Sequence, residues 1–181
     1  MKLQKKKDKN LDLDQFKIIS HWTHLAILTL LETTNVYVNE HQIAKAMGIS
    51  SSQAKFALER LLNLGMATQL ESGRYISTNE FFIQGNDIPN EYIKQFHEQM
   101  LLKSHEAIRS VGVDERDVSH LFLAVDPKDF SEAKKFITEF REEFDRRFSN
   151  SETNKKLVYA LGIQFYKLSH PNDLGVKNEV P

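Results

Sequence analysis

The sequence contains no cysteine, which excludes disulfide bonds, thiol catalysis and thiolate metal sites. It also lacks a long apolar run, because the longest ones, around Leu25–Leu31 and Leu121–Val125, are far shorter than a membrane span. Residues Met1–Asn10 are charged and have no apolar stretch, so they are not a signal peptide. Together these absences predict a cytoplasmic protein that does not associate with a membrane.

An excess of charge of either sign is also missing. The 181 residues carry 24 Lys and Arg against 25 Asp and Glu, which gives a formal net charge of −1. Lysines gather in the first nine residues, and this part predicts either a solubilising tail or an arm that contacts an anionic polymer. A protein that depends on phosphate contacts is usually more basic. Composition alone therefore does not predict DNA binding.

A catalytic constellation is absent as well. No nucleophile lies beside a base, and neither a metal triad nor a phosphate-binding glycine loop occurs in the sequence. His21 and His24 have the spacing of neighbours on a helix, but no third ligand candidate is near them, so we interpret them as structural. The sequence predicts no enzymatic activity, no catalytic residue, no cofactor and no metal site.

The clearest positive pattern runs from Asn39 to Thr78 and predicts a winged helix-turn-helix. Asn39 and Ser50 are each followed three residues later by glutamine, which is the spacing of a capping box. Gly48 separates the two predicted helices at a turn that needs a positive φ. The buried face of the second helix is predicted to be Ala54, Ala57, Leu58 and Leu61. Strands at Met66–Leu70 and Arg74–Ser77, around a turn at Glu71–Gly73, would form the wing.

The second half of the chain predicts a long helix and a β-α-β unit. The helix covers Asn90–Val111, and two strands at Val118–Asp126 and Lys156–Leu168 flank another helix at Ser131–Phe148. Two strands make a poor sheet, so we expect a second subunit to add its own strands and form a homodimer. The fold class is α+β. Its parts are a lysine-rich arm at 1–11, the winged domain at 12–86, the dimerisation domain at 87–168 and a tail at 169–181.

Several short sequence motifs, spread over residues 11–168, match those of a known protein family in their order and spacing. They include Leu13-Asp14-Gln15-Phe16, His21-Trp22-Thr23-His24, Ala57-Leu58-Glu59-Arg60-Leu61, Phe96-His97-Glu98-Gln99-Met100, Val113-Asp114-Glu115-Arg116-Asp117 and Ile163-Gln164-Phe165. In these pieces the chain resembles a bacterial family of transcriptional regulators that is built on a domain of unknown function and often has many paralogues. The resemblance implies a winged helix, an α+β domain and no known catalytic activity. Longer members carry a further helix-turn-helix region where this chain has its lysine-rich arm.

Two functions fit these observations. The first is DNA binding as a homodimer, for which the predicted contact residues are Lys45, Ser51, Ser52, Lys55, Glu59, Arg60 and Arg74, with Arg74 at the tip of the wing. The second is a protein-interaction module that does not bind DNA, centred on an outward-facing Phe56. A third interpretation of Phe56, as a residue packed under the wing or the long helix, would remove the argument for the second function.

Overall fold

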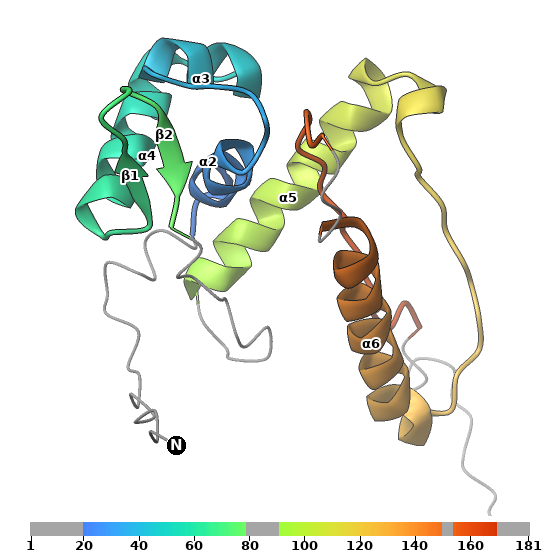
Figure 1. Cartoon of the computed structure of the whole chain (residues 1–181). Coiled ribbons are helices and arrows are strands. Elements are labelled where there is room, and N and C mark those ends of the chain that lie inside the picture. Colours follow the sequence, from blue (N-terminus) through green and yellow to red (C-terminus); the bar gives the residue numbers. More distant parts are fainter. Residues whose placement is uncertain (1–19, 79–90, 150–153, 170–181) are drawn as a thin grey trace, which may run out of the picture. The chain divides into compact units, whose positions relative to one another are not determined.

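The computed structural model describes residues 20–78, 91–149 and 154–169. The chain divides into two compact units, residues 1–118 with 153–160 (unit 1) and residues 119–152 with 161–181 (unit 2). Its described part is α+β and rich in helix, with one antiparallel two-stranded sheet (Figure 1). The predicted arm at 1–11, the first part of the predicted first helix and the tail beyond residue 169 lie outside the described residues.

Unit 1 contains three short helices, a hairpin and a long helix (Figure 1). In chain order they are α2 (Trp22–Leu31), α3 (Glu40–Met47), α4 (Ser51–Asn63), β1 (Ala67–Gln69), β2 (Tyr75–Ser77) and α5 (Glu91–Ser110), followed by the 3-10 turn η1 (Val113–Glu115). These bounds confirm the helices and the hairpin expected from the sequence. The side chain of His21 caps α2 by accepting from the backbone N–H of Thr23.

The turn between α3 and α4 follows from local chemistry. Asn39 Oδ1 accepts from the backbone N–H of Gln42 at 3.0 Å, and Ser50 and Gln53 form a reciprocal capping box. Gly48 ends α3 with φ 62°, as the sequence predicted. A capping box would have the Gln42 side chain accept from the N–H of Asn39. Its Oε1 instead accepts from the N–H of Val38, one residue earlier, at 2.9 Å.

The hydrophobic core of the described residues lies between Ile27 and Ala67. Ala54, Ala57, Leu58 and Leu61 form the buried face of α4, as predicted. Two connections close this core. Tyr75 N–H in β2 donates to the carbonyl of Tyr37 at 2.9 Å, and Thr34 N–H donates to the carbonyl of Lys155 at 2.8 Å. The second connection, which brings residues 154–156 onto the loop after α2, was not predicted from the sequence.

Unit 2 contains the 3-10 turn η2 (Pro127–Asp129) and the helix α6 (Phe130–Ser149), which confirms the predicted helix. The two predicted strands did not form. Residues 116–126 and 154–169 have no regular secondary structure, and the backbone of residues 119–125 makes no hydrogen bond to another described backbone group. The reason is that a strand needs a hydrogen-bonding neighbour, and these two segments do not pair with each other. Among the described residues, no helix is long and apolar enough to cross a membrane.

Candidate nucleic-acid interface

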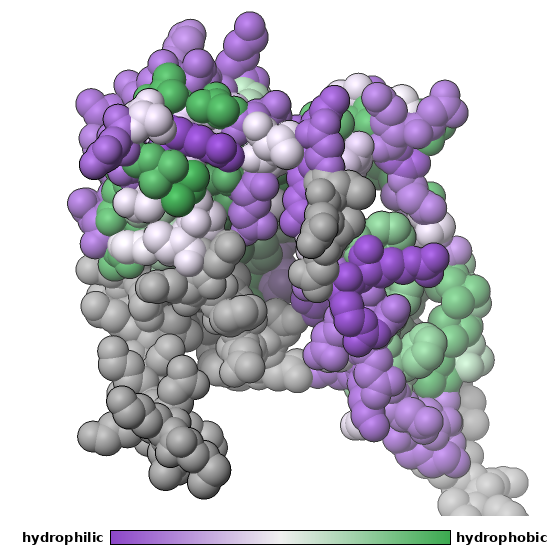
Figure 2. Space-filling model, viewed as in Figure 1, coloured by the Kyte–Doolittle hydropathy of each residue, from purple (hydrophilic) through white to green (hydrophobic). Residues whose placement is uncertain are grey.

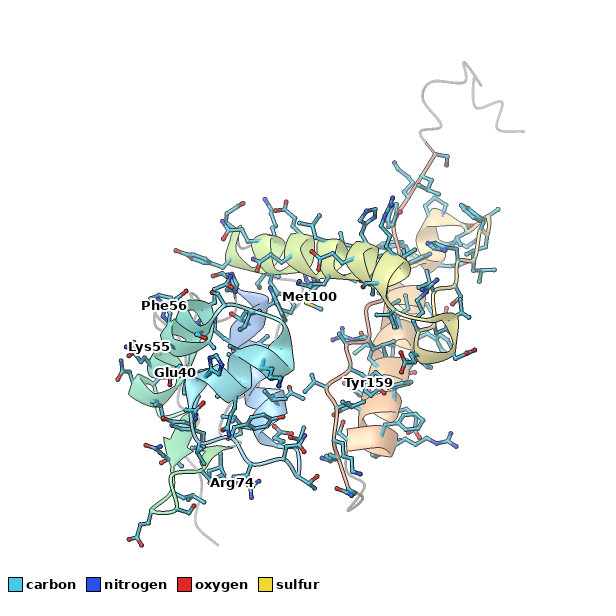
Figure 3. All side chains as sticks on the ribbon, turned by 90° about the horizontal axis from the view of Figure 1, so that it is seen from above. Glu40, Lys55, Phe56, Arg74, Met100 and Tyr159 are labelled. Atoms are coloured by element: carbon cyan, nitrogen blue, oxygen red, sulfur yellow. The ribbon has the colours of Figure 1, made fainter. Side chains whose placement is uncertain are left out.

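One strip of α4 faces away from the core (Figure 3). The exposed residues along it are Ser51, Ser52, Lys55, Phe56 and Glu59, and Arg60 beside them is half-buried. The strip follows from helical periodicity, because the small and aliphatic residues of α4 occupy the other face of the helix and point into the core. These six residues all belong to the predicted site, so the structure brings the predicted α4 residues together on one surface. We call this surface the α4 strip.

The N-terminal end of the α4 strip is held by α3. His41 on α3 lies with Nδ1 3.1 Å from the Oγ of Ser51. The first turn of α4 also presents backbone N–H groups that helical bonds do not use, and these favour anions. His41 was not among the predicted site residues. The signal for it was its position two residues after the Asn39 cap, in the first turn of α3, where it is exposed.

The charges of the α4 strip largely balance one another. Lys55 Nζ lies 3.9 Å from Glu59 Oε1, and both side chains are more than half exposed. Such an exposed i,i+4 pair contributes little to stability, about 0.3–0.5 kcal/mol. It does hold Lys55 beside a carboxylate of opposite sign. Lys55 must therefore break or share this pair to bind a phosphate.

Phe56 is 57% exposed, which excludes the interpretation that it packs under the wing or the long helix (Figure 3). The guanidinium carbon of Arg60 lies 4.6 Å from the centre of the Phe56 ring, within cation–π distance. Shallow hollows lie on either side of Phe56. One of about 310 Å³ is lined by Phe56, Glu59, Arg60, Asn63 and Leu64. The other, of about 290 Å³, is lined by Phe56, Arg60, Gln53 and the start of α2.

The start of α2 brings two histidines to the second hollow. His24 is buried, while His21 is half-buried and accepts from the Thr23 N–H through Nδ1. Burial lowers the pKa of His21 from its ordinary value of 6.5. No three His, Asp or Glu side chains gather in the described ranges where they could hold a metal ion.

The hairpin presents different chemistry from that expected at a wing tip. Its turn is Leu70–Arg74, closed by a 2.9 Å bond from the Leu70 N–H to the Arg74 carbonyl, and its exposed residues are Leu70, Glu71 and Ser72. Arg74 is half-buried, and its Nη2 donates to the carbonyl of Thr33 at 3.4 Å. The arginine is therefore turned back onto the end of α2. A carboxylate, that of Glu71, occupies the position where the sequence led us to expect a cation.

Lys45 is exposed on the last turn of α3 and apart from the α4 strip's ion pair. Among the predicted DNA-contact residues it therefore stands apart from those on α4.

Comparisons with known proteins give one match. No curated protein and no solved structure matches the chain. A family model described as Domain of unknown function (DUF4423) matches residues 2–168, which covers both units. With most of its length covered, the chain belongs to this family.

Proposed function

We propose that residues 39–78 form a winged helix-turn-helix and that the chain acts as a transcriptional regulator, binding DNA as a homodimer with α4 in the major groove. The observation that carries this proposal is the α4 strip. Its serines and Lys55 are exposed at the N-terminal half of a helix that Gly48 and two caps hold against α3, and Glu59 is exposed one turn beyond Lys55. Recognition helices contact base edges through this half.

The chemistry of the strip suits base contacts better than a broad phosphate contact. Serine hydroxyls can bond to either type of base edge, and glutamate accepts from the N4 amino group of cytosine. Lys45 and Lys55 supply the cations for phosphates. Because Glu59 lies 3.9 Å from Lys55 on the same strip, non-specific binding should be weak and the discrimination between sequences comparatively large.

Binding to genomic DNA fragments at several salt concentrations tests the proposal. We expect Lys55→Ala to weaken binding and to lower the log–log salt slope by about one, as the loss of one phosphate contact does. Glu59→Gln should strengthen non-specific binding, because it removes a like charge that faces the backbone. Lys94→Ala is the matched control, since Lys94 also belongs to an exposed ion pair, with Glu91, but lies on α5. The proposal fails if no fragment binds better than micromolar at ~50 mM salt.

A second candidate is a winged helix that docks a protein, and the exposure of Phe56 favours it. An exposed aromatic ring with a guanidinium stacked on it matches an apolar pocket flanked by a carboxylate on a partner. In that case Phe56→Ala should weaken partner binding by roughly 2 kcal/mol or more, and salt should have little effect. If DNA is the ligand, Lys55→Ala should weaken binding and the salt dependence should be strong. The two variants therefore separate the two candidate functions.

A further inference from the structure

The apolar side chains of unit 2 have no cover within the described chain. α6 has no buried residue, although five phenylalanines lie along it. They are Phe130, Phe136, Phe140, Phe144 and Phe148, with exposed fractions of 40%, 70%, 46%, 38% and 58%. Their spacing places them on a single face about a third of the helix circumference wide. We call this face the phenylalanine face, and Figure 2 shows hydrophobic surface over this part of unit 2.

The segments before and after α6 have the same character. Leu121, Phe122 and Leu123 are 80%, 79% and 57% exposed, and Leu161 and Ile163 after the helix are 49% and 39% exposed. The C-terminal segment contacts α6 where Phe165 stacks on Phe130 with ring centres 5.3 Å apart. That contact shows which side of α6 the C-terminal segment approaches.

We propose that a second copy of this chain covers the phenylalanine face and pairs with residues 121–125 and 161–168, so that two copies of unit 2 form one four-stranded sheet. This inference goes beyond DNA binding and specifies the surface of the homodimer named in the proposed function. It does not depend on α4, because every residue that carries it lies in unit 2.

The exposed area is of the size that a stable dimer buries. With a phenylalanine side chain covering on the order of 200 Å², the phenylalanine face and residues 121–123 leave roughly 900 Å² of apolar surface open. A monomer's largest apolar patch is usually about 300–600 Å². A standard interface buries about 800 Å² per partner. The open surface of unit 2 therefore exceeds what a monomer tolerates and matches one side of an interface.

Strand number and symmetry select a second copy as the partner. Each chain offers two strand-length segments, too few for a stable sheet, whereas two copies supply four strands and two covering helices. A two-fold interface uses the same surface on both subunits, so phenylalanine rings would meet phenylalanine rings, with the guanidinium of Arg147 held over the Phe148 ring near one end of the face. The net charge of −1 also adds little repulsion between two copies.

The test combines the mass of the full chain in solution with hydrogen exchange. At micromolar concentration we expect twice the chain mass of 21.0 kDa, with the amides of residues 121–125 and 161–168 protected. Phe136→Asp should raise the dimer dissociation constant roughly 30-fold or more and remove that protection. Phe136 is 70% exposed in the single chain, so this change removes little burial within the monomer itself. Thr138→Asp adds the same charge at an exposed position off the phenylalanine face and should remain dimeric.

Each other outcome overturns the inference. A monomeric wild-type chain means that no second copy binds, and protection in that monomer would mean that the sheet closes within one chain. A dimer with unprotected segments, or a dimer that Phe136→Asp leaves intact, would place the contact on another surface. DNA binding is measured separately through Lys55→Ala, so failure of the dimer surface and failure of the proposed function can be told apart.

Discussion

Gly48 is the residue on which the α3–α4 turn depends. Its φ of 62° lies in the left-handed region, and a Cβ added there would meet no atom within 4 Å. Any cost of substitution is therefore a backbone cost, and for an L-residue it is about 1–2 kcal/mol, larger for a β-branched side chain. We expect Gly48→Val to lower the free energy of unfolding by more than Gly48→Asn, because asparagine tolerates this region. Chemical denaturation measures the free energy of unfolding of both variants. If Gly48→Val were as stable as the wild type, the left-handed conformation of residue 48 in this turn would be wrong.

His21 should make the stability of unit 1 depend on pH. Burial lowers its folded-state pKa below 6.5, so the unfolded chain binds more protons as the pH falls through that value. The contribution to stability is thus present above pH 6.5 and is lost as the pH falls toward the lower folded pKa. Protonation of Nδ1 would also remove the acceptor for the Thr23 N–H.

We expect His21→Asn to flatten this dependence, since asparagine keeps a capping oxygen without titrating. Denaturation midpoints of the wild type and of His21→Asn, measured between about pH 7.5 and 5.5, test this expectation. A midpoint that stays constant in the wild type over this window would show that another group compensates for His21.

At the scale of elements, the sequence predicted what is local. Helices can be recognised in a sequence from apolar periodicity and capping residues, so the bounds of α4, α5 and α6 could be predicted to within a residue or two. The exposed residues of the α4 strip followed from the same periodicity. The orientation of Arg74 did not, because its bond to Thr33 joins residues 41 positions apart. The strands around α6 were predicted from an apolar pattern, but pairing requires a neighbour that the sequence pattern does not specify.

The contact of α5 with α2 gives a prediction at this scale. Gln99 on α5 donates through Nε2 to the Ser20 carbonyl at 2.7 Å and accepts from the Trp22 N–H at 3.3 Å, and Lys103 lies over the Trp22 ring. Gln99→Ala removes both bonds at the start of α2, which should cost about 1–2 kcal/mol of unfolding free energy. It should also change the fluorescence of Trp22, the single tryptophan of the chain.

Glu98→Ala is the control for that experiment, because Glu98 is the exposed neighbour of Gln99 on the same helix. It should leave both the fluorescence and the unfolding free energy near those of the wild type. If Gln99→Ala behaved like this control, α5 would not be fixed to α2 through these bonds.

At the scale of the whole molecule, the two units differ in where their stability originates. The buried apolar residues of the described chain run from Ile27 to Ala67, so this part of unit 1 has a core of its own. α6 in unit 2 buries nothing by itself. Hydrophobic burial is the main favourable term in folding, and in the proposed dimer unit 2 obtains most of it from the second copy.

This difference predicts two thermal transitions with different responses to protein concentration. Association stabilises only the unit that makes the contact, so the midpoint for unit 2 should rise with concentration by mass action. Unit 1 should not respond. Trp22 fluorescence reports on unit 1, since Trp22 begins α2, and far-UV circular dichroism reports on all helices, including α6.

We expect a dichroism step that moves with concentration and a fluorescence midpoint that does not. Phe136→Asp should abolish the concentration dependence while leaving the fluorescence midpoint in place. Coincident steps that shift together would instead mean that the chain folds as a single cooperative unit, with unit 1 also stabilised by the dimer.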